Sequence, residues 1–544
     1  MLVAMLGIGA CSDVGGGAPE QEGSLDLTAE ISAQHPLRGD ITFSTTTDDT
    51  RPRVEIVSPS GHGVAVTPTD GVAGEQAVPI LGARPDTTYT VTVTADGTTQ
   101  STEVTTGSLP GDLPPVEVEV EAEADAMSPG LTLFDAVPIN GNGANDGHLL
   151  AVDPAGEIVW YYRQAHSIQD SRRTSAGDIL FINHEVGARQ LDPLTDDFVE
   201  FSGVTGLETA PEDEQGRKYV GPDAIRVDTD QMHHEVAELP NGNLVTLSRE
   251  VRTVEGFPDD LCEEGDDFDG SYEVGADTVV EFSPETGEVV HEWSLFDYVD
   301  PLESLDVLSA GSFCGTYLDP VYPDMSARDW THANGVVLDE ARNVLWVSVR
   351  HLNQLLAIRY ADDDAGTAGE LVWKLGEGGD FDLTEGEWFL YQHAPQVLPD
   401  GTLMIYDNGN GRPGTSFDDP AEYPYSRAVQ YELDTDAMTA RQVWESRLDT
   451  PESPVYAPFV GDADMLDGGT VLVTHGGQTD PPADSPRAEG VTVWGRIVEV
   501  DYDSGDVVFD LRVRDDGGEG WRIYRSERIP TLYPDGYEVE TISP

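Results

Sequence analysis

The chain has 544 residues, of which 102 are acidic and 29 are basic, so its formal net charge is −73. A surface this acidic argues against nucleic acid and anionic membranes as general partners. Because 38% of the residues are hydrophobic and strand patterns recur along the chain, we predict a folded protein of two or more domains with a strongly hydrated surface, not a disordered chain.

The N-terminal segment, residues 1–23, combines a short apolar run with a Gly-rich tether. The run ends in Ile8-Gly9-Ala10-Cys11, which resembles the lipobox of bacterial lipoproteins, where the cysteine is lipidated and the preceding residues are removed. We therefore predict an exported protein that is lipid-anchored through Cys11 to the cell envelope, on its periplasmic or extracellular face. An ordinary cleaved signal peptide is the alternative. The run is shorter than the roughly 20 residues that a membrane-spanning helix needs.

The other two of the three cysteines are Cys262 and Cys314. In an exported protein, two remaining cysteines most simply form one disulfide. We predict that pair, with two unpaired thiols as the alternative.

Residues 24–107 alternate short strands with turns and predict a small β-sandwich. The stretch from Ala83 to Val93 looks like the tyrosine-corner region of fibronectin type III domains and related sandwiches. Residues 108–116 contain three prolines and predict a linker. Because the sandwich holds no cluster of titratable residues, we interpret it as a spacer or packing domain.

From residue 117 to residue 544 one unit recurs. Five strand–turn–strand hairpins alternate with six segments in which an acidic turn separates two apolar strands. About six units of four strands each predict an all-β, six-bladed β-propeller, in which the first and last segments complete one blade together. A stack of sandwiches is the alternative.

Three of the hairpins carry a histidine at the start of the first strand. Reflecting each hairpin about its turn places His234 opposite Arg249, and His332 opposite Arg350. The same operation places His393 opposite Asn408. In a propeller the first strand of each blade lies nearest the axis, so we expect these side chains to converge on the mouth of the central channel.

The expected cluster contains imidazoles, an arginine and, at Asn334, an amide. Imidazole is a common metal ligand, but a guanidinium among the ligands would repel a cation, so we predict no metal and no cofactor. Arginine offers a planar fork of donors that suits the oxygens of phosphate or sulfate. In ester transfer, one neutral imidazole could attack the central atom and a second could protonate the departing oxygen.

At these residues the sequence resembles the bacterial arylsulfate sulfotransferases, which do not use phosphoadenosine phosphosulfate. The shared motifs are D-W-x-H-x-N at residues 329–334, S-x-R-H at residues 348–351, and Q-H at residues 392–393 followed by D-N-G at residues 407–409. The resemblance implies a β-sandwich followed by a six-bladed propeller. It also implies that His393 is transiently sulfated, that His332 and Arg350 bind the sulfuryl group, and that Asn334 helps to hold its oxygens.

The resemblance also implies a further active-site histidine, which comes from the pair His233 and His234. The hairpin argument favours His234 as the catalytic residue, and His233, on the other side of the strand, stays as the alternative. The resemblance implies a small-molecule aryl sulfate as donor and a phenol as acceptor. We expect further substrate contacts from four residues near the histidines: Arg249, Asn408, Trp330 and Tyr391.

A second interpretation of the whole chain is a propeller without catalytic activity. Such a protein would bind a sulfated or carboxylated ligand, or serve as an interaction scaffold, because propellers carry many functions and the fold alone decides none.

Overall fold

The computed structural model describes residues 25–46, 51–70, 73–120, 126–139, 146–184, 186–203, 219–257, 271–303, 316–318, 326–446, 448, 455–483, 485, 488, 490–515 and 520–542. These residues form an all-β structure with three short 3-10 helices, η1 (Leu295–Asp297), η3 (Arg350–Leu352) and η4 (Pro420–Glu422). Within them, no helix is long and apolar enough to span a membrane. Cys11, Cys262 and Cys314 lie outside the described residues, so the lipid anchor and the disulfide stay predictions.

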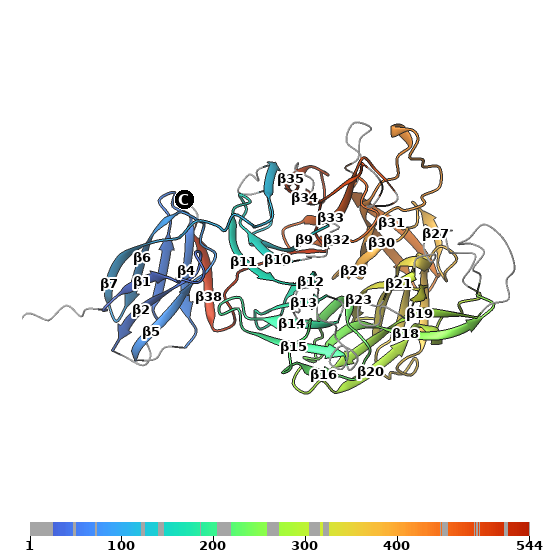
Figure 1. Ribbon diagram of the computed structural model, residues 1–544, viewed down its shortest axis with the longest axis horizontal. Helices are drawn as coiled ribbons and strands as arrows, with labels where there is room; N and C mark the ends of the chain where they lie inside the picture. Colours follow the sequence, from blue (N-terminus) through green and yellow to red (C-terminus); the bar gives the residue numbers. More distant parts are fainter. Residues whose placement is uncertain are drawn as a thin grey trace, which may run out of the picture.

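The N-terminal region contains two sheets that enclose one core (Figure 1). The first comprises β1 (Thr28–Ile31), β2 (Gly39–Thr45) and β5 (Gly74–Ile80). The second comprises β3 (Arg53–Val57), β4 (Gly63–Pro68), β6 (Thr88–Ala95), β7 (Thr98–Thr105) and β38 (Tyr537–Ile542). Buried and exposed residues alternate along β6, which is the pattern of a strand with one face on a core. The Tyr89 hydroxyl accepts a hydrogen bond from the backbone N–H of Arg84 at 2.8 Å, the contact that a tyrosine corner predicts.

Six further sheets follow in the described part of the chain. The first contains β9 (Leu131–Pro138), β10 (Gly147–Val152), β11 (Ile158–Gln164), β36 (Trp521–Arg522) and β37 (Ser526–Ile529). The second contains β12 (Ile168–Arg173), β13 (Ile179–Asn183), β14 (Gly187–Leu191), β15 (Phe198–Gly203) and β16 (Ile225–Val227). The third contains β17 (His233–Glu238), β18 (Leu244–Glu255), β19 (Ser271–Phe282), β20 (Val289–Ser294), β21 (Thr316–Leu318) and β22 (Ser326–Asp329). The fourth contains β23 (Ala333–Asp339), β24 (Val344–Val349), β25 (Gln354–Arg359) and β26 (Leu371–Gly376). The fifth contains β27 (Asp382–Glu385), β28 (His393–Val397), β29 (Leu403–Asp407), β30 (Arg427–Asp434) and β31 (Thr439–Ser446). The sixth contains β32 (Asp462–Met465), β33 (Thr470–Asp480), β34 (Thr492–Asp501), β35 (Val507–Val513) and β8 (Val116–Val120).

The first strands of successive sheets contact one another in chain order. The contacts run from β12 to β17, β23, β28 and β32, and β37 contacts both β12 and β33. Segments from the two ends of this region complete two of the sheets, because β36 and β37 pair with β9, and β8 pairs with β35. The predicted hairpins are confirmed as the antiparallel pairs β17–β18, β23–β24 and β28–β29.

The last strand of the chain returns to the N-terminal region. β38 pairs antiparallel with β4, and Figure 1 shows it in red beside the blue strands. The hydroxyl of Tyr533, just before this strand, donates a hydrogen bond to the backbone carbonyl of Pro79 at 2.9 Å. One apolar cluster also joins the sandwich to β9–β14. The division of the chain at residues 107 and 117 stays a prediction. It assigns residues 117–544 to one domain and so does not account for the pairing of β38 with the N-terminal sheet.

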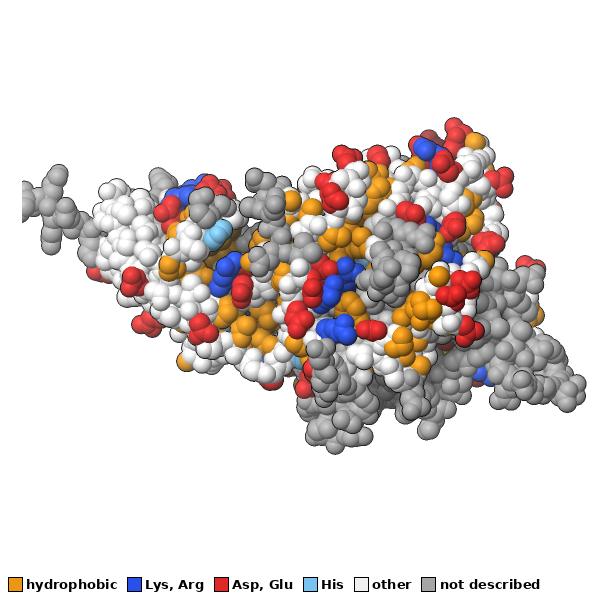
Figure 2. Space-filling view, turned by 90° about the horizontal axis from the view of Figure 1, so that it is seen from above, with side chains coloured by type: hydrophobic (Ala, Val, Ile, Leu, Met, Phe, Trp, Pro, Cys, Tyr) orange, Lys and Arg blue, Asp and Glu red, His pale blue; other side chains and the backbone are white. Residues whose placement is uncertain are grey.

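Acidic side chains are scattered over the face drawn in Figure 2, and many of the basic side chains there lie beside acidic ones. This distribution agrees with the excess of acidic residues along the whole chain.

The return of β38 generates a prediction about stability. A chain shortened to end at Gly536 loses one of the two pairing partners of β4 and the part-buried side chains of Tyr537 and Val539. We expect the N-terminal sandwich to lose on the order of 2 kcal/mol of stability and to be cut faster by protease. A chain that ends at Ile542 is the control, and equal cleavage rates in the two shortened proteins would contradict the prediction.

Candidate active site

The histidines are positioned by irregularities at the start of three first strands. The pairing register shifts between His233 and Val236 in β17, between Ala333 and Gly335 in β23, and between His393 and Gln396 in β28. Left-handed backbone accompanies these shifts, with φ of 61° at His234 and 48° at Ala394. Such bulges bend a strand and re-aim its side chains.

The bulges correct two of the predicted pairings. His393 pairs with Tyr406 and not with Asn408, and His233, not His234, pairs in β17, with Leu247. The third prediction is confirmed, because the backbone N–H of Arg350 donates to the carbonyl of His332 at 3.3 Å. The side chains converge in spite of the altered register: the rings of His234 and His332 are 4.9 Å apart.

His393 is held in one tautomer by a buried amide. Its Nδ1 lies 2.6 Å from Oδ1 of Asn408, whose Nδ2 donates to the carbonyls of Ala457 and Val460 at 2.7 and 2.8 Å. Because the amide oxygen can only accept, Nδ1 of His393 carries the proton and Nε2 keeps its lone pair. Burial, together with the charge of Arg350, holds the pKa of His393 well below its usual value, so the ring is neutral at pH 7.

These contacts correct the expectation that Asn408 binds substrate. Its side chain is fully buried, and its amide oxygen and nitrogen are both hydrogen-bonded inside the protein. Asn408 therefore lies behind the His393 ring and holds it.

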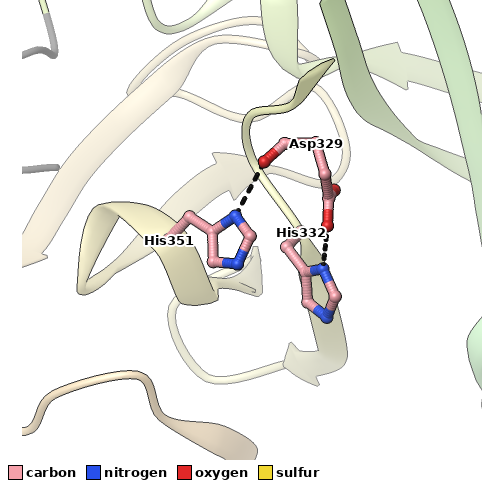
Figure 3. A group of neighbouring side chains, drawn as sticks. All are labelled: Asp329, His332 and His351. Atoms are coloured by element: carbon pink, nitrogen blue, oxygen red, sulfur yellow. Dashed lines mark hydrogen bonds and ion pairs between the residues drawn. The ribbon is translucent and has the colours of Figure 1, made fainter. Parts of the chain in front are cut away.

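His332 and His351 both turn their Nδ1 atoms toward Asp329 (Figure 3). Nδ1 of His332 lies 2.5 Å from the carboxylate, and Nδ1 of His351 lies 2.8 Å from the backbone carbonyl. Both acceptors require a protonated Nδ1, so the Nε2 atoms lie on the sides of the rings turned away from Asp329. The two rings stack at 4.6 Å. Burial lowers the pKa of His351 to about 3.

His234 is backed by a second histidine. Nδ1 of His234 lies 2.8 Å from Nδ1 of His233. Nε2 of His233 faces the Ser248 carbonyl at 3.1 Å and the Asp277 carboxylate at 3.3 Å, so Nε2 is protonated. One of the two Nδ1 atoms donates to the other, and this hydrogen bond holds the His234 ring against His233. His234 thus lines the pocket with His332, and His233 supports it from behind.

Arg350 brings a guanidinium into the same pocket. It begins η3 directly after β24. One Nη donates to the Pro458 carbonyl at 2.9 Å, the guanidinium lies 4.8 Å from the ring centre of Tyr391, and the buried Nε has no partner among the described residues. Burial lowers the pKa of this arginine from its ordinary value, and a buried cation with a donor to spare suits an anionic ligand.

The other predicted contacts fall at different depths. Asn334 is fully buried, and its amide nitrogen donates to the Gln392 carbonyl at 2.9 Å. Arg249 lies behind His332, with an Nη 3.7 Å from the Asp329 carboxylate. Trp330 is fully buried in an apolar cluster beside Phe296, and its role at an aryl ring stays a prediction.

A buried charge cluster lies next to the pocket. Arg525 donates to Asp170 and Glu235 at 2.7 and 2.8 Å, and to the backbone carbonyl of Asn334 at 2.8 Å. Neither Arg525 nor Asp277 stands in a recognisable motif, so sequence reasoning missed both. Asp329 and His351 stand inside the motifs quoted above, which could have indicated them.

Asp329, His332 and His351 are also the residues best placed to hold a metal in the described part of the chain. Their ligand atoms lie within 4.8 Å of one another. However, the His332 Nδ1 proton lies between that ring and the carboxylate, so a cation there would have to displace a charge-assisted hydrogen bond. The arrangement is better suited to hold imidazoles than to bind a metal.

Comparison with known proteins adds an independent finding. The family described as arylsulfotransferase matches residues 117–525. An arylsulfate sulfotransferase of Escherichia coli O6:H1 is 25% identical over 275 residues, which are 42% of this chain and 44% of that protein. One from Lelliottia amnigena is 25% identical over 290 residues, 44% of this chain and 45% of that protein. The chain thus spans less than half the length of the curated relatives it matches.

Solved structures are less similar. A protein of unknown function from Bacteroides caccae has a TM-score of 0.39 at 14% identity, covering 73% of this chain and 98% of that one. A periplasmic gluconolactonase from Pseudomonas aeruginosa has a TM-score of 0.29 at 11% identity, covering 90% and 99%. These scores are too low to support a conclusion about fold or function.

The lowered pKa of His351 predicts a pH dependence of stability. Between about pH 6.5 and 3 the unfolded chain binds a proton at this residue and the native protein does not, so the free energy of unfolding falls as the pH falls. From pH 7 to pH 5 we expect a loss of about 2 kcal/mol from this residue. Chemical unfolding across that range should therefore show a larger loss in the wild type than in His351→Gln, and parallel curves would contradict the prediction.

Proposed function

Because the chain belongs to the arylsulfotransferase family, we propose that it transfers a sulfuryl group from a phenolic sulfate ester to a phenol. The observation that carries the proposal is one pocket in which the neutral imidazole of His393 keeps its Nε2 lone pair beside the buried guanidinium of Arg350. The ester itself supplies the sulfuryl group, so the reaction needs neither phosphoadenosine phosphosulfate nor another cofactor.

In the first half-reaction His393 is the nucleophile. Its Nε2 lone pair attacks sulfur, the bond from sulfur to the aryl oxygen breaks, and the phenolate departs with that electron pair. Arg350 stabilises the charge on the sulfuryl oxygens, because a buried cation acts strongly on charge that develops beside it. Asn334 lies next to the same oxygens in this proposal. In the second half-reaction a phenol attacks sulfur, and His393 regains its lone pair.

His332 is the better placed proton carrier. Its imidazolium form would be stabilised by the Asp329 carboxylate at 2.5 Å, as in the histidine–aspartate pairs of hydrolases. It would give a proton to the first phenolate and take one from the second phenol, so the proton balance closes over a full cycle. His234, backed by His233 and Asp277, is the second candidate for this task.

An aryl ring fits the aromatic side chains near Arg350. The ring of Tyr391 lies under the guanidinium of Arg350, and Tyr456 is close enough to interact electrostatically with that guanidinium. The ring of Phe417, 39% exposed, is 5.7 Å from that of Tyr456. We propose that the donor and the acceptor phenols bind against this group, because aromatic rings pack well edge to face or offset.

The architecture and the location of the protein are part of the proposal. The closed order of contacts supports a six-bladed propeller in which each sheet is one blade. It runs through β12, β17, β23, β28 and β32, and β37 closes it by contacting β33 and β12. The Tyr89 contact supports a fibronectin-type sandwich before it. Export with lipidation at Cys11, and a disulfide between Cys262 and Cys314, rest on the sequence patterns alone.

The proposal predicts that phenol release from a chromogenic aryl sulfate depends on an added acceptor phenol. Substituting His393→Gln should reduce release by several orders of magnitude, as loss of a nucleophile does in other enzymes that form covalent intermediates. His291→Gln, on outer strand β20, is the matched control and should keep wild-type activity. Binding of the ester without turnover in the wild type would instead favour the scaffold interpretation.

A second prediction separates charge from geometry at Arg350. Lysine keeps the positive charge but lacks the planar fork of donors. We expect Arg350→Lys to reduce kcat/KM by roughly a hundredfold while the protein stays folded, as judged by circular dichroism. Unchanged kinetics in this variant would remove the guanidinium from the mechanism.

A further inference from the structure

The three histidines that line the pocket differ in the group that is hydrogen-bonded to their Nδ1. Behind His332 this group is a carboxylate, Asp329, at 2.5 Å. Behind His234 it is another imidazole, His233, at 2.8 Å. Behind His393 it is the neutral amide of Asn408 at 2.6 Å. Only His393, the proposed nucleophile, has a backing group that cannot take the proton away.

We propose that Asn408 is a positioning residue that keeps the sulfated form of His393 reactive by holding its Nδ1 proton in place. This inference rests on the proposed function and adds the control of the intermediate's lifetime. The amide acts through the imidazole and does not touch the substrate.

The chemistry of the intermediate explains the need for a neutral acceptor. When Nε2 bonds to sulfur and Nδ1 keeps its proton, the ring becomes a cationic imidazolium that bears a sulfonate. The ring nitrogen is then a good leaving group: the bond from nitrogen to sulfur breaks, its electron pair returns to Nε2, and a phenol oxygen bonds to sulfur. If a carboxylate took the Nδ1 proton, the ring would be a neutral sulfonated imidazole, and nitrogen would have to leave as an imidazolate.

Asn408 is built into the protein in a way that fixes this orientation. Its amide nitrogen donates to two backbone carbonyls, those of Ala457 and Val460. In a flipped amide the side-chain oxygen would point at these two carbonyl oxygens, and no hydrogen bond could form. Its own backbone carbonyl accepts a hydrogen bond from the Ser426 hydroxyl at 2.7 Å. That hydroxyl in turn accepts from the backbone N–H of Ala457 at 2.8 Å. The side chain therefore has one available orientation, with its oxygen toward His393.

The test compares two substitutions in the two half-reactions. Rapid mixing with a chromogenic aryl sulfate at about pH 8, where an unperturbed imidazole is neutral, measures the burst of phenol from the first step. Steady-state release with an added phenol measures turnover, and a rapid quench followed by mass spectrometry measures the sulfated fraction of the enzyme.

Opposite effects are expected from the two variants. Asn408→Asp should keep a burst of about one phenol per chain but lower the turnover about tenfold or more, since a charged hydrogen bond stabilises the intermediate more than a neutral one. The sulfated fraction should rise accordingly. Asn408→Ala removes the acceptor that orients the ring, so the burst rate should fall about tenfold or more.

Three results would overturn the inference. Asn408→Asp could turn over at the wild-type rate without accumulating sulfated enzyme, or both variants could slow the burst and the turnover by the same factor, which is the mark of a purely structural role. A wild type that shows no burst would overturn the proposed function itself, and this inference with it. The first two results leave the proposed function standing.

A measurement on the wild type covers the case in which the variants do not fold. Nitrogen NMR of the full chain with labelled histidine, assigned by comparison with His393→Gln, reports which ring nitrogen is protonated. An unprotonated Nε2 in His393 is expected. An unprotonated Nδ1 would overturn the inference, because Asn408 would then hold no proton.

Discussion

Hydrogen bonds to Nδ1 of each pocket imidazole are the interaction on which the account depends. His393 and His332 donate from Nδ1 to an acceptor inside the protein, and Nδ1 of His234 is hydrogen-bonded to His233. A neutral imidazole has one proton and one lone pair, so fixing the proton at Nδ1 commits Nε2 to act as a nucleophile or base. Without these hydrogen bonds each ring could turn or change tautomer, and its Nε2 would no longer be held in place to react with the substrate.

Burial gives these hydrogen bonds their effect on charge. Removal from water disfavours the protonated form of histidine and lowers the pKa of both His393 and His234. The charge of Arg350 lowers the pKa of His393 further, and the neighbouring histidines lower that of His234 further. The pocket is thus a local exception in a protein with a formal charge of −73. A fixed guanidinium beside the uncharged imidazole of His393 can attract an anion and leave the lone pair of that ring free to react.

Much of this could be predicted from the sequence, for reasons that belong to particular residues. The alternation of apolar residues on either side of turns such as Asn241–Gly242 indicated the hairpins, and the repeated position of histidine in them indicated a shared rim. The register of β17 and β28 could not be predicted, because a bulge adds a residue without changing the apolar pattern. For the same reason the predicted pairing of His393 with Asn408 is wrong, although the two side chains are hydrogen-bonded.

Contacts between distant segments were beyond sequence reasoning. Arg525 reaches Asp170 and Glu235 across more than 280 positions of the chain and stands in no motif with them. The pairing of β38 with β4 joins the two ends of the chain, and a short strand pattern carries no sign of which sheet it will enter. Asp277 supports His233 through the fold alone.

The central claim is that Nε2 of His393 takes up the sulfuryl group. The most direct measurement is to quench the wild-type protein after mixing with an aryl sulfate in the absence of acceptor, and to locate the sulfuryl group by peptide mass spectrometry together with NMR of the labelled ring. The account predicts one sulfuryl group per chain, on Nε2 of His393, that disappears when a phenol is added before the quench. A sulfuryl group on Nδ1, on another residue, or on none while phenol is still being released would contradict it.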